Sequence, residues 1–393
     1  MSTTNTRNGD RFILGMLSIG HLTNDWVAGT LWLLAPAIAA SLGLGPTEVG
    51  LILAINGLGA GLMYIPAGML ADRLGRPGLL MLISFWWVAI GYFTATVASG
   101  FWGITLLLAV GVMGDAFWHP VATGVLMKRF PERRAQVLGI HAMGGSIGAD
   151  VLGPLSSGFL LGLFSWQTTL QWLIIPAIIM GIIFIFYSKR LDQFAIRRKT
   201  SFTLSSLTRQ WNTREGLRLV FLMIFYNMAL YAMLSMTPLK LQNDYGVSPF
   251  VSGVIFACIL LGGTVFQPIT GKISDRIGRR LVILNLLIGA TIFAFIAAFS
   301  SDFVYFVISL TIAIAMLTAV RPAILATAVE HTGGAESTTL GIVFTILDGV
   351  GALGAFLAGI AGETTLSYSF LMGAVLALIA TILVSALPRT NTI

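Results

Sequence analysis

The chain is a succession of long apolar segments separated by short polar breaks, and this feature restricts what it can fold into. An α-helix needs about 20 apolar residues to cross the hydrocarbon core of a bilayer. Segments of this kind lie near 12–40, 47–69, 78–97, 101–127, 136–160, 166–187, 218–239, 249–270, 281–299, 302–328, 338–361 and 366–387. The pattern therefore predicts an all-α integral membrane protein of about twelve transmembrane helices.

Composition favours a membrane protein over a soluble one. Hydrophobic residues make up 56% of the chain and charged residues 10%, whereas soluble domains contain about 25% charged residues. The first apolar segment carries Asn24 and Asp25. A signal peptide has an uninterrupted apolar run, so we expect this segment to be a retained first helix. The single Cys258 permits no internal disulfide.

Lys and Arg lie almost entirely on one side of the predicted helices. The central run from Lys189 to Arg218 is on that side, while the other side has Lys240 and a predicted helix contains Arg321. Positively charged loops stay in the cytoplasm. We therefore predict a multi-pass protein of the cell inner (cytoplasmic) membrane, with both termini and the central loop in the cytoplasm. These loops account for the net charge of +7, so no nucleic-acid partner is expected.

The chain contains an internal repeat. The pattern Gly-x-x-x-Asp-Arg-x-Gly-Arg begins at Gly68 and again at Gly271, 203 residues later. Further matches at this spacing or one residue less are Gly43, Pro46 and Gly50 with Gly246, Pro249 and Gly253, and His119-Pro120 with Arg321-Pro322. The repeat predicts a six-helix half at 1–187, a cytoplasmic linker at 188–217 and a second six-helix half at 218–393. Parallel halves of this kind suit a transporter that rocks about a site held between them.

With these motifs, the sequence resembles the major facilitator superfamily over nearly its whole length, since the repeated loop is that family's signature. The first half resembles the fosmidomycin-resistance type of exporter. The matching residues are Gly20-His21-Leu22-Thr23-Asn24-Asp25, Phe117-Trp118-His119-Pro120, and Gly144-Gly145 through Gly153-Pro154. Those relatives usually carry an acidic residue after the His-Pro pair, where this chain has Val121. The resemblance implies the major facilitator fold and secondary active transport by alternating access.

Few ionisable side chains lie within the predicted helices. An ionised group at the bilayer centre costs at least ~2.5–3.5 kcal/mol, so each is a candidate functional residue. They are His21, Asp25, Asp115, His119, His141, Asp150, Arg321 and Asp348. His21 and Asp25 are four residues apart, as are Asp115 and His119, so each pair shares a helix face. We predict that Asp25, Asp115, His119, His21 and Asp150 couple transport to protons. The alternative is a set of neutral structural hydrogen bonds.

Arg321 is the only cation within the predicted helices. Its partner is either Asp348 on the next helix or an anionic group of the substrate, which the planar guanidinium suits. The sequence leaves both open. Trp26 and Trp118 lie too deep to be interfacial anchors. The predicted substrate-binding residues are Arg321, Asp348, Trp118, Trp26, Asn24, Asn227 and Tyr231.

Two sets of residues are predicted to gate the transporter. The signature loops are implied by the resemblance to latch the cytoplasmic side through Gly68, Asp72, Arg73, Gly75 and Arg76 and through Gly271, Asp275, Arg276, Gly278 and Arg279. The second set resembles the antiporter motif of exporters and comprises Gly148, Gly153, Pro154 and Gly158, with Asp150 as an unusual member. Small residues allow helices to approach closely, and proline bends a helix.

These observations predict a proton-coupled efflux transporter, an antiporter, for a small anionic or amphipathic compound. We expect a monomer in membrane lipid whose partners are protons and its substrate, with no cofactor, no resident metal and no enzymatic activity. One alternative is an importer, a proton–organic anion symporter anchored on Arg321. Others are a divalent-metal transporter or an intramembrane metal enzyme that uses His21, Asp25, Asp115 and His119. The duplicated signature loops argue against the enzyme.

Overall fold

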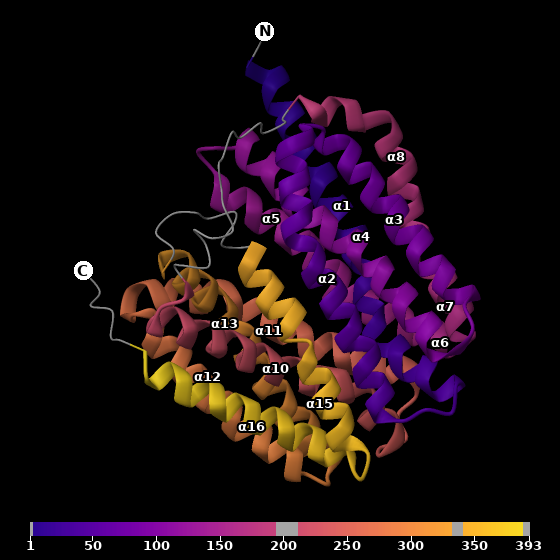
Figure 1. The fold of residues 1–393 in the computed structure, drawn as a ribbon, viewed down its shortest axis with the longest axis vertical. Coiled ribbons are helices and arrows are strands. Elements are labelled where there is room, and N and C mark those ends of the chain that lie inside the picture. The colour runs from indigo at the N-terminus through magenta and orange to yellow at the C-terminus, as the bar shows by residue number, and fades with distance from the viewer. Residues whose placement is uncertain (1–2, 194–210, 332–340, 388–393) are drawn as a thin grey trace.

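The computed structural model describes residues 3–193, 211–331 and 341–387, and these residues form helices and their connections (Figure 1). The first part contains α1 (Thr3–Ser41), α2 (Pro46–Leu74), α3 (Pro77–Val97), α4 (Gly100–Arg129), α5 (Arg134–Ser146), the π-helical turn η1 (Ile147–Leu152), α6 (Gly153–Leu161), α7 (Trp166–Leu173) and α8 (Ile175–Asp192). The second part contains α10 (Arg214–Asn243), α11 (Pro249–Ile277), α12 (Arg279–Phe299), α13 (Phe303–His331), the π-helical turn η2 (Thr345–Val350), α15 (Leu353–Gly362) and α16 (Leu366–Ser385).

The described helices confirm an all-α membrane protein. Within the described ranges, 10 helical spans are long and apolar enough to cross a membrane. The two predicted segments that do not meet this criterion are the first and the fifth. The first, in α1, carries His21, Asn24 and Asp25, and the fifth is divided into α5, η1 and α6. The structure thus supports ten of the about twelve predicted crossing helices.

The helices pack as two groups (Figure 1). In the first half, α1 to α8, α4 packs against α2 and α3, and α3 packs against α8. In the second half, α10 to α16, α12 packs against α13 and α16, and α10 packs against α15 and α16. Helix α8 ends at Asp192 and α10 begins at Arg214, so helices extend into both ends of the linker predicted at 188–217. Residues 194–210 of that linker lie outside the described ranges.

Two seams join the halves. Helix α2 packs against η2 and α15, and α11 packs against η1 and α6. Glycines make this approach possible, because a Cβ atom on Gly57 would lie 2.6 Å from the carbonyl oxygen of Asp348. In the other seam, a Cβ atom on Gly158 would lie 2.7 Å from the carbonyl oxygen of Pro249. The backbones of opposite halves are therefore in direct contact along both seams.

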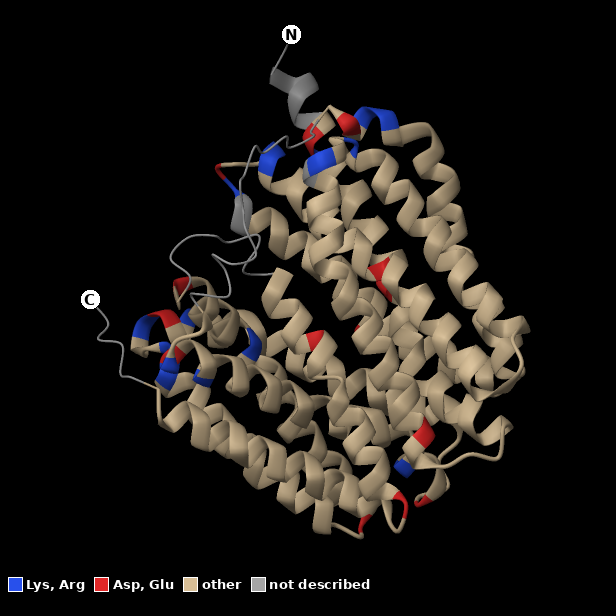
Figure 2. Ribbon diagram, viewed as in Figure 1, with Lys and Arg blue, Asp and Glu red and all other residues tan. Residues whose placement is uncertain are grey.

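Charged side chains concentrate at one end of the bundle. We call this the basic end, and it carries the ends of α2, α4, α8 and α11 with Arg73, Arg129, Arg190 and Arg276. Figure 2 shows the blue and red segments mostly at helix ends along the top and left of the view, while the interior is almost entirely tan. At the opposite end, the Lys240 ammonium is buried and lies 2.8 Å from Asp244. This pairing explains how a lysine is tolerated on the side where the sequence has few basic residues.

The two halves meet away from the basic end and diverge toward it (Figure 1). Where they meet, the Thr47 N–H donates to Glu363 Oε1 at 3.0 Å, and a Cβ atom on Gly359 would lie 2.9 Å from the Cα atom of Thr47. Further along α2 toward the basic end, Thr345 donates to the carbonyl oxygen of Gly61 at 3.0 Å. Helix α2 therefore contacts the second half as far along as Gly61, and Ile65, one turn further, still lies beside Gly341.

Candidate functional site

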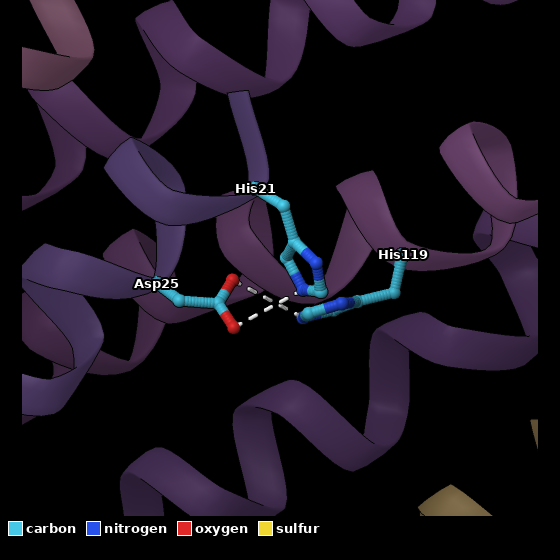
Figure 3. A group of neighbouring side chains, drawn as sticks. All are labelled: His21, Asp25 and His119. Atoms are coloured by element: carbon cyan, nitrogen blue, oxygen red, sulfur yellow. Dashed lines mark ion pairs between the residues drawn. The ribbon is translucent and has the colours of Figure 1, made fainter. Parts of the chain in front are cut away.

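Four of the predicted ionisable side chains converge between α1 and α4. We call His21, Asp25, Asp115 and His119 the His–Asp cluster. His21 Nε2 lies 3.2 Å from Asp25 Oδ2, and His119 Nε2 lies 3.9 Å from Asp25 Oδ1 and 3.7 Å from Asp115 Oδ2. Figure 3 shows both imidazoles directed toward the Asp25 carboxylate. The spacing of four residues within each pair predicted shared faces, and the packing of α1 on α4 brings the two faces together.

Neighbouring polar groups hold this cluster in place. Asn24 Nδ2 donates to Asp115 Oδ1 at 2.7 Å and to the Asp115 carbonyl oxygen at 3.2 Å. On the other side, the rings of His21 and His141 stack with centroids 4.2 Å apart. Asn24 is fully buried and bound to Asp115, so in this conformation its amide orients a carboxylate.

The contacts of His21 require a proton between it and Asp25. His21 Nδ1 lies 2.8 Å from the carbonyl oxygen of His141, and a carbonyl oxygen can only accept, so Nδ1 carries a hydrogen. His21 Nε2 then faces Asp25 Oδ2 at 3.2 Å. Two acceptor atoms would repel each other at this distance unless one of them also carries a hydrogen. The pair is therefore arranged to hold one proton, on the imidazole or on the carboxylate.

The His–Asp cluster is also the set of residues that could bind a divalent metal ion, the alternative that the sequence left open. His21, Asp25 and His119 offer ligand atoms within 4.8 Å of one another. A tetrahedral zinc site would draw each pair of ligand atoms to roughly 3.3 Å, given metal–nitrogen distances near 2.0 Å. His119 Nε2 instead lies 3.9 Å from Asp25 Oδ1, whereas His21 is at hydrogen-bonding distance from the same carboxylate. The arrangement fits a hydrogen-bonded group better than a coordination sphere.

A second charged group lies in the other half. Arg321 Nη2 on α13 is 3.0 Å from Oδ1 and 3.1 Å from Oδ2 of Asp348 in η2. The Arg321 side chain is 29% exposed, and its guanidinium carbon lies 5.9 Å from the centroid of the Phe344 ring. In this conformation the partner of Arg321 is Asp348, one of the two partners that the sequence left open. Among the hydrogen bonds of the described residues, the guanidinium uses Nη2, so Nη1 and Nε can serve an anion.

Asp150 lies at a seam between the halves, although the sequence grouped it with the His–Asp cluster. Thr264 on α11 donates to Asp150 Oδ2 at 3.1 Å. Asp150 lies in η1 and Asp348 lies in η2, 198 residues later, so both halves place an aspartate in a π-helical turn. Such turns frequently mark functional sites. Asp150 therefore forms a contact between halves, and its role in proton coupling stays a prediction.

The predicted aromatic residues occupy different surroundings. Trp118 is fully buried within the first half, with its ring centroid 4.9 Å from that of Phe85. The Trp26 Nε1–H donates to Ser156 at 2.8 Å, and the Trp26 side chain lines an open groove between α1, α6, α7 and α8. The contacts given for both tryptophans are thus with residues of the first half, and neither contact reaches the second half.

Other site residues lie nearer the second half or were not predicted. Tyr231 packs against Trp32 across the halves with centroids 5.4 Å apart, and Asn227 donates to the carbonyl oxygen of Leu347 at 2.5 Å. Tyr64 is not among the residues predicted from the sequence, yet its hydroxyl lies 3.5 Å from Asp348 Oδ2. A tyrosine in an apolar segment is ordinary, so no sequence signal distinguishes it.

The predicted gating residues lie at the basic end, in the packing of η1 and α6 against α1, and in one seam. Gly75 and Gly278 end their helices at φ 61° and 97°, conformations that favour glycine. Arg279 Nη2 lies 3.5 Å from Asp275 Oδ1 and 2.7 Å from Glu330 Oε1, all within the second half. The side chain of Asp72 lies outside the described residues. In the antiporter-like motif, a Cβ atom on Gly153 would lie 2.7 Å from the backbone of Gly29.

We expect Asp275→Asn to slow transport about three- to tenfold while leaving the free energy of unfolding within ~1 kcal/mol of the wild type. The Asp275 side chain is 67% exposed, and an exposed ion pair adds little stability. A slower cycle would therefore reflect the latch. The measurement is flux together with thermal unfolding on the same preparations. Glu132→Gln, at an exposed acid of the basic end outside the signature loops, is the matched control. Loss of substrate binding with an unchanged cycle would contradict the latch.

Comparisons with known proteins agree on one family. A family model described as "Major Facilitator Superfamily" matches residues 17–242 and 219–392. The fosmidomycin resistance protein of Escherichia coli (strain K12) is 23% identical over 368 residues, which cover 93% of this chain and 89% of that protein. The hexuronate transporter of Bacillus subtilis (strain 168) is 23% identical over 300 residues, which cover 74% of this chain and 70% of that protein. A crystal structure of a mutant of the nucleoside transporter NupG superposes with a TM-score of 0.78 at 15% identity and covers 96% of this chain and 100% of that one.

Proposed function

Since this chain belongs to the Major Facilitator Superfamily, we propose that it exports a small anionic or amphipathic compound in exchange for protons, by alternating access. The observation that carries the proposal is the juxtaposition of two groups. One is the His–Asp cluster of the first half, where His21 and Asp25 are arranged to hold a proton. The other is the guanidinium of Arg321 in the second half. A transporter that exchanges an anion for protons needs sites of both kinds.

We further propose that the basic end lies in the cytoplasm, because positively charged loops are retained there. Both termini would then be cytoplasmic, and the protein would reside in the inner membrane as a monomer. The divergence of the halves toward the basic end then corresponds to a cytoplasm-facing state (Figure 1). This is the state in which an exporter takes up its substrate.

Protons drive the cycle if the two facing states bind them with different affinity. The proton between His21 and Asp25 is enclosed by α1, α4 and α5, and His119 is the more accessible member of the cluster, with 23% of its side chain exposed. We propose that His119 exchanges protons with the space between the halves and that Asp25 passes them to His21. Asp115, held by Asn24, provides the second carboxylate.

Arg321 supplies the anion site. Without substrate, Asp348 neutralises the guanidinium at 3.0 Å, which avoids an unpaired buried charge. A substrate carboxylate or phosphonate would compete with Asp348 for the remaining N–H groups. The hexuronate transporter among the relatives supports this class of substrate, since a hexuronate carries a carboxylate. Resistance to fosmidomycin in the other relative supports export.

The proposal is tested with purified protein in liposomes under an imposed pH gradient. Fosmidomycin and glucuronate are supplied on either side, and flux is followed in both directions together with the internal pH. Export predicts that each compound moves against the proton flow. Movement of the anion together with protons would instead identify the importer that the sequence left open. Flux that does not respond to the pH gradient would contradict proton coupling.

A further inference from the structure

We infer that Tyr64 on α2 links the His–Asp cluster of the first half to the Arg321–Asp348 pair of the second half. The Tyr64 ring lies beside the His119 ring, with centroids 6.0 Å apart, and its hydroxyl lies 3.5 Å from Asp348 Oδ2. Tyr64 is buried, and it belongs to the opposite half from Asp348. It is a positioning residue, and the inference rests on the proposed proton-coupled export of an anion.

Asp348 is shared between two donors. Its Oδ1 and Oδ2 lie 3.0 and 3.1 Å from the same nitrogen of Arg321, and Oδ2 also faces the Tyr64 hydroxyl. At 3.5 Å the contact with Tyr64 is at the outer limit of a hydrogen bond. If the hydroxyl approached more closely, Asp348 Oδ2 would accept its hydrogen bond from Tyr64, and only Oδ1 would remain bonded to Arg321. The guanidinium would then have more donors for an anion.

The position of Tyr64 along α2 determines when this approach occurs. The contact between Thr345 and the carbonyl oxygen of Gly61 lies one turn before Tyr64, and from there α2 continues toward the basic end, where the halves diverge. Closing the basic end brings this part of α2 toward η2. It therefore shortens the distance between the Tyr64 hydroxyl and Asp348. Binding of an anion to Arg321 and closure of the basic end then favour each other, because such coupling is reciprocal.

The ring of Tyr64 lies beside His119, so the same movement of α2 is linked to the protonation of the His–Asp cluster. The ionisable groups that act on Tyr64 are His119 and Asp115 from α4, Asp348 from η2, Arg321 from α13 and Tyr231 from α10. His21 and Asp25 act through His119, which contacts Asp25 at 3.9 Å. A change of charge on His119 thus alters the surroundings of the ring whose hydroxyl meets Asp348. Tyr64 thus contacts a member of each group.

The test measures the distance between the halves by electron–electron double resonance and needs no substrate. Spin labels are placed at Leu74→Cys and Ile277→Cys, the exposed last residues of α2 and α11, in a Cys258→Ser background. The full chain is examined in lipid nanodiscs from about pH 5 to pH 9, the range around histidine ionisation. With Tyr64 present, the ratio of open to closed populations at the basic end changes with pH.

Tyr64→Phe should raise the ratio of open to closed populations about three- to tenfold, the effect of losing one ordinary hydrogen bond, because the contact with Asp348 is already partly formed at 3.5 Å. The response of that ratio to pH should also weaken. In an Asp348→Asn background, Tyr64→Phe should have little further effect. Tyr226→Phe is the matched control, because Tyr226 is fully buried on α10 and its hydroxyl has no hydrogen-bond partner among the described residues.

The outcomes separate this inference from the proposed function. A normal pH response in the parent protein, with the same ratios in Tyr64→Phe, would overturn the role of Tyr64 and leave proton coupling intact. Equal effects of Tyr64→Phe and Tyr226→Phe would also overturn it, since any loss of a buried hydroxyl would then suffice. No pH response in the parent protein would remove the proposed proton coupling, and the inference with it.

Discussion

Asp25→Asn is expected to reduce flux driven by a pH gradient to the level of liposomes without protein. An asparagine has the shape of the aspartate but neither binds nor releases a proton at physiological pH. Its amide N–H can donate to His21 Nε2, which now faces Asp25 Oδ2 at 3.2 Å. The contact that needs a mobile proton in the wild type would thus be satisfied permanently. Asp115→Asn should have the same effect through His119, 3.7 Å from Asp115 Oδ2.

The control for these variants is exchange of substrate at equal pH on both sides. Exchange does not require net proton movement, so both variants should retain it if they fold and bind normally. The measurement compares gradient-driven flux and exchange in the same liposomes. Gradient-driven flux at the wild-type rate in both variants would remove Asp25 and Asp115 from proton coupling. Loss of exchange as well would indicate damage to folding or binding.

Arg321→Ala is expected to abolish transport of anions and also to destabilise the protein by at most about 3–5 kcal/mol, because it leaves Asp348, a partly buried carboxylate whose side chain is 17% exposed, without its cation. The two effects have different origins and can be separated. Adding Asp348→Asn removes the unpaired charge, so the double variant should regain thermal stability. It should not regain transport, since no guanidinium is present to bind the anion.

The measurements are the unfolding temperature and the binding of glucuronate and fosmidomycin by the wild type, Arg321→Ala and the double variant. Asp348→Asn alone serves as the control for the second substitution. If the double variant regained transport as well as stability, Arg321 would be a structural partner of Asp348, and the proposal of an anionic substrate would lose its support.

The sequence predicted those parts of the site that depend on one helix at a time. The spacing of His21 and Asp25, and of Asp115 and His119, determined that each pair shares a face, because the helical period is local. That α1 would pack on α4 and merge the pairs depends on tertiary contacts. In the same way, Arg321 and Asp348 were both recognised from their cost in the membrane. Their pairing at 3.0 Å required the structure.

The directions in which Trp118 and Tyr64 face could not be predicted from the sequence, for the same reason. The sequence placed Trp118 among the substrate-binding residues, whereas its ring faces Gly20 and the core of the first half, where a Cβ atom on Gly20 would lie 2.6 Å from the ring. Tyr64 faces the other half from an apolar helix. When all the neighbours of a helix are apolar, a large side chain lies where a neighbouring helix has a small residue that leaves room for it. The position of a residue along its helix can be predicted from one sequence, whereas this direction cannot.

The two π-helical turns have a geometric consequence for the seams. Each turn holds one residue more than the α-helix around it, so the helix beyond it is rotated by about 100° from the position that an uninterrupted helix would give. The glycines that face the opposite half from α6 and α15, Gly158 and Gly359, both lie beyond these turns. The extra residue in η1 and in η2 thus rotates the following helix so that its small residues face α11 and α2 instead of lipid. Deleting one residue from either turn would leave a helix of the right length with the wrong side against its partner.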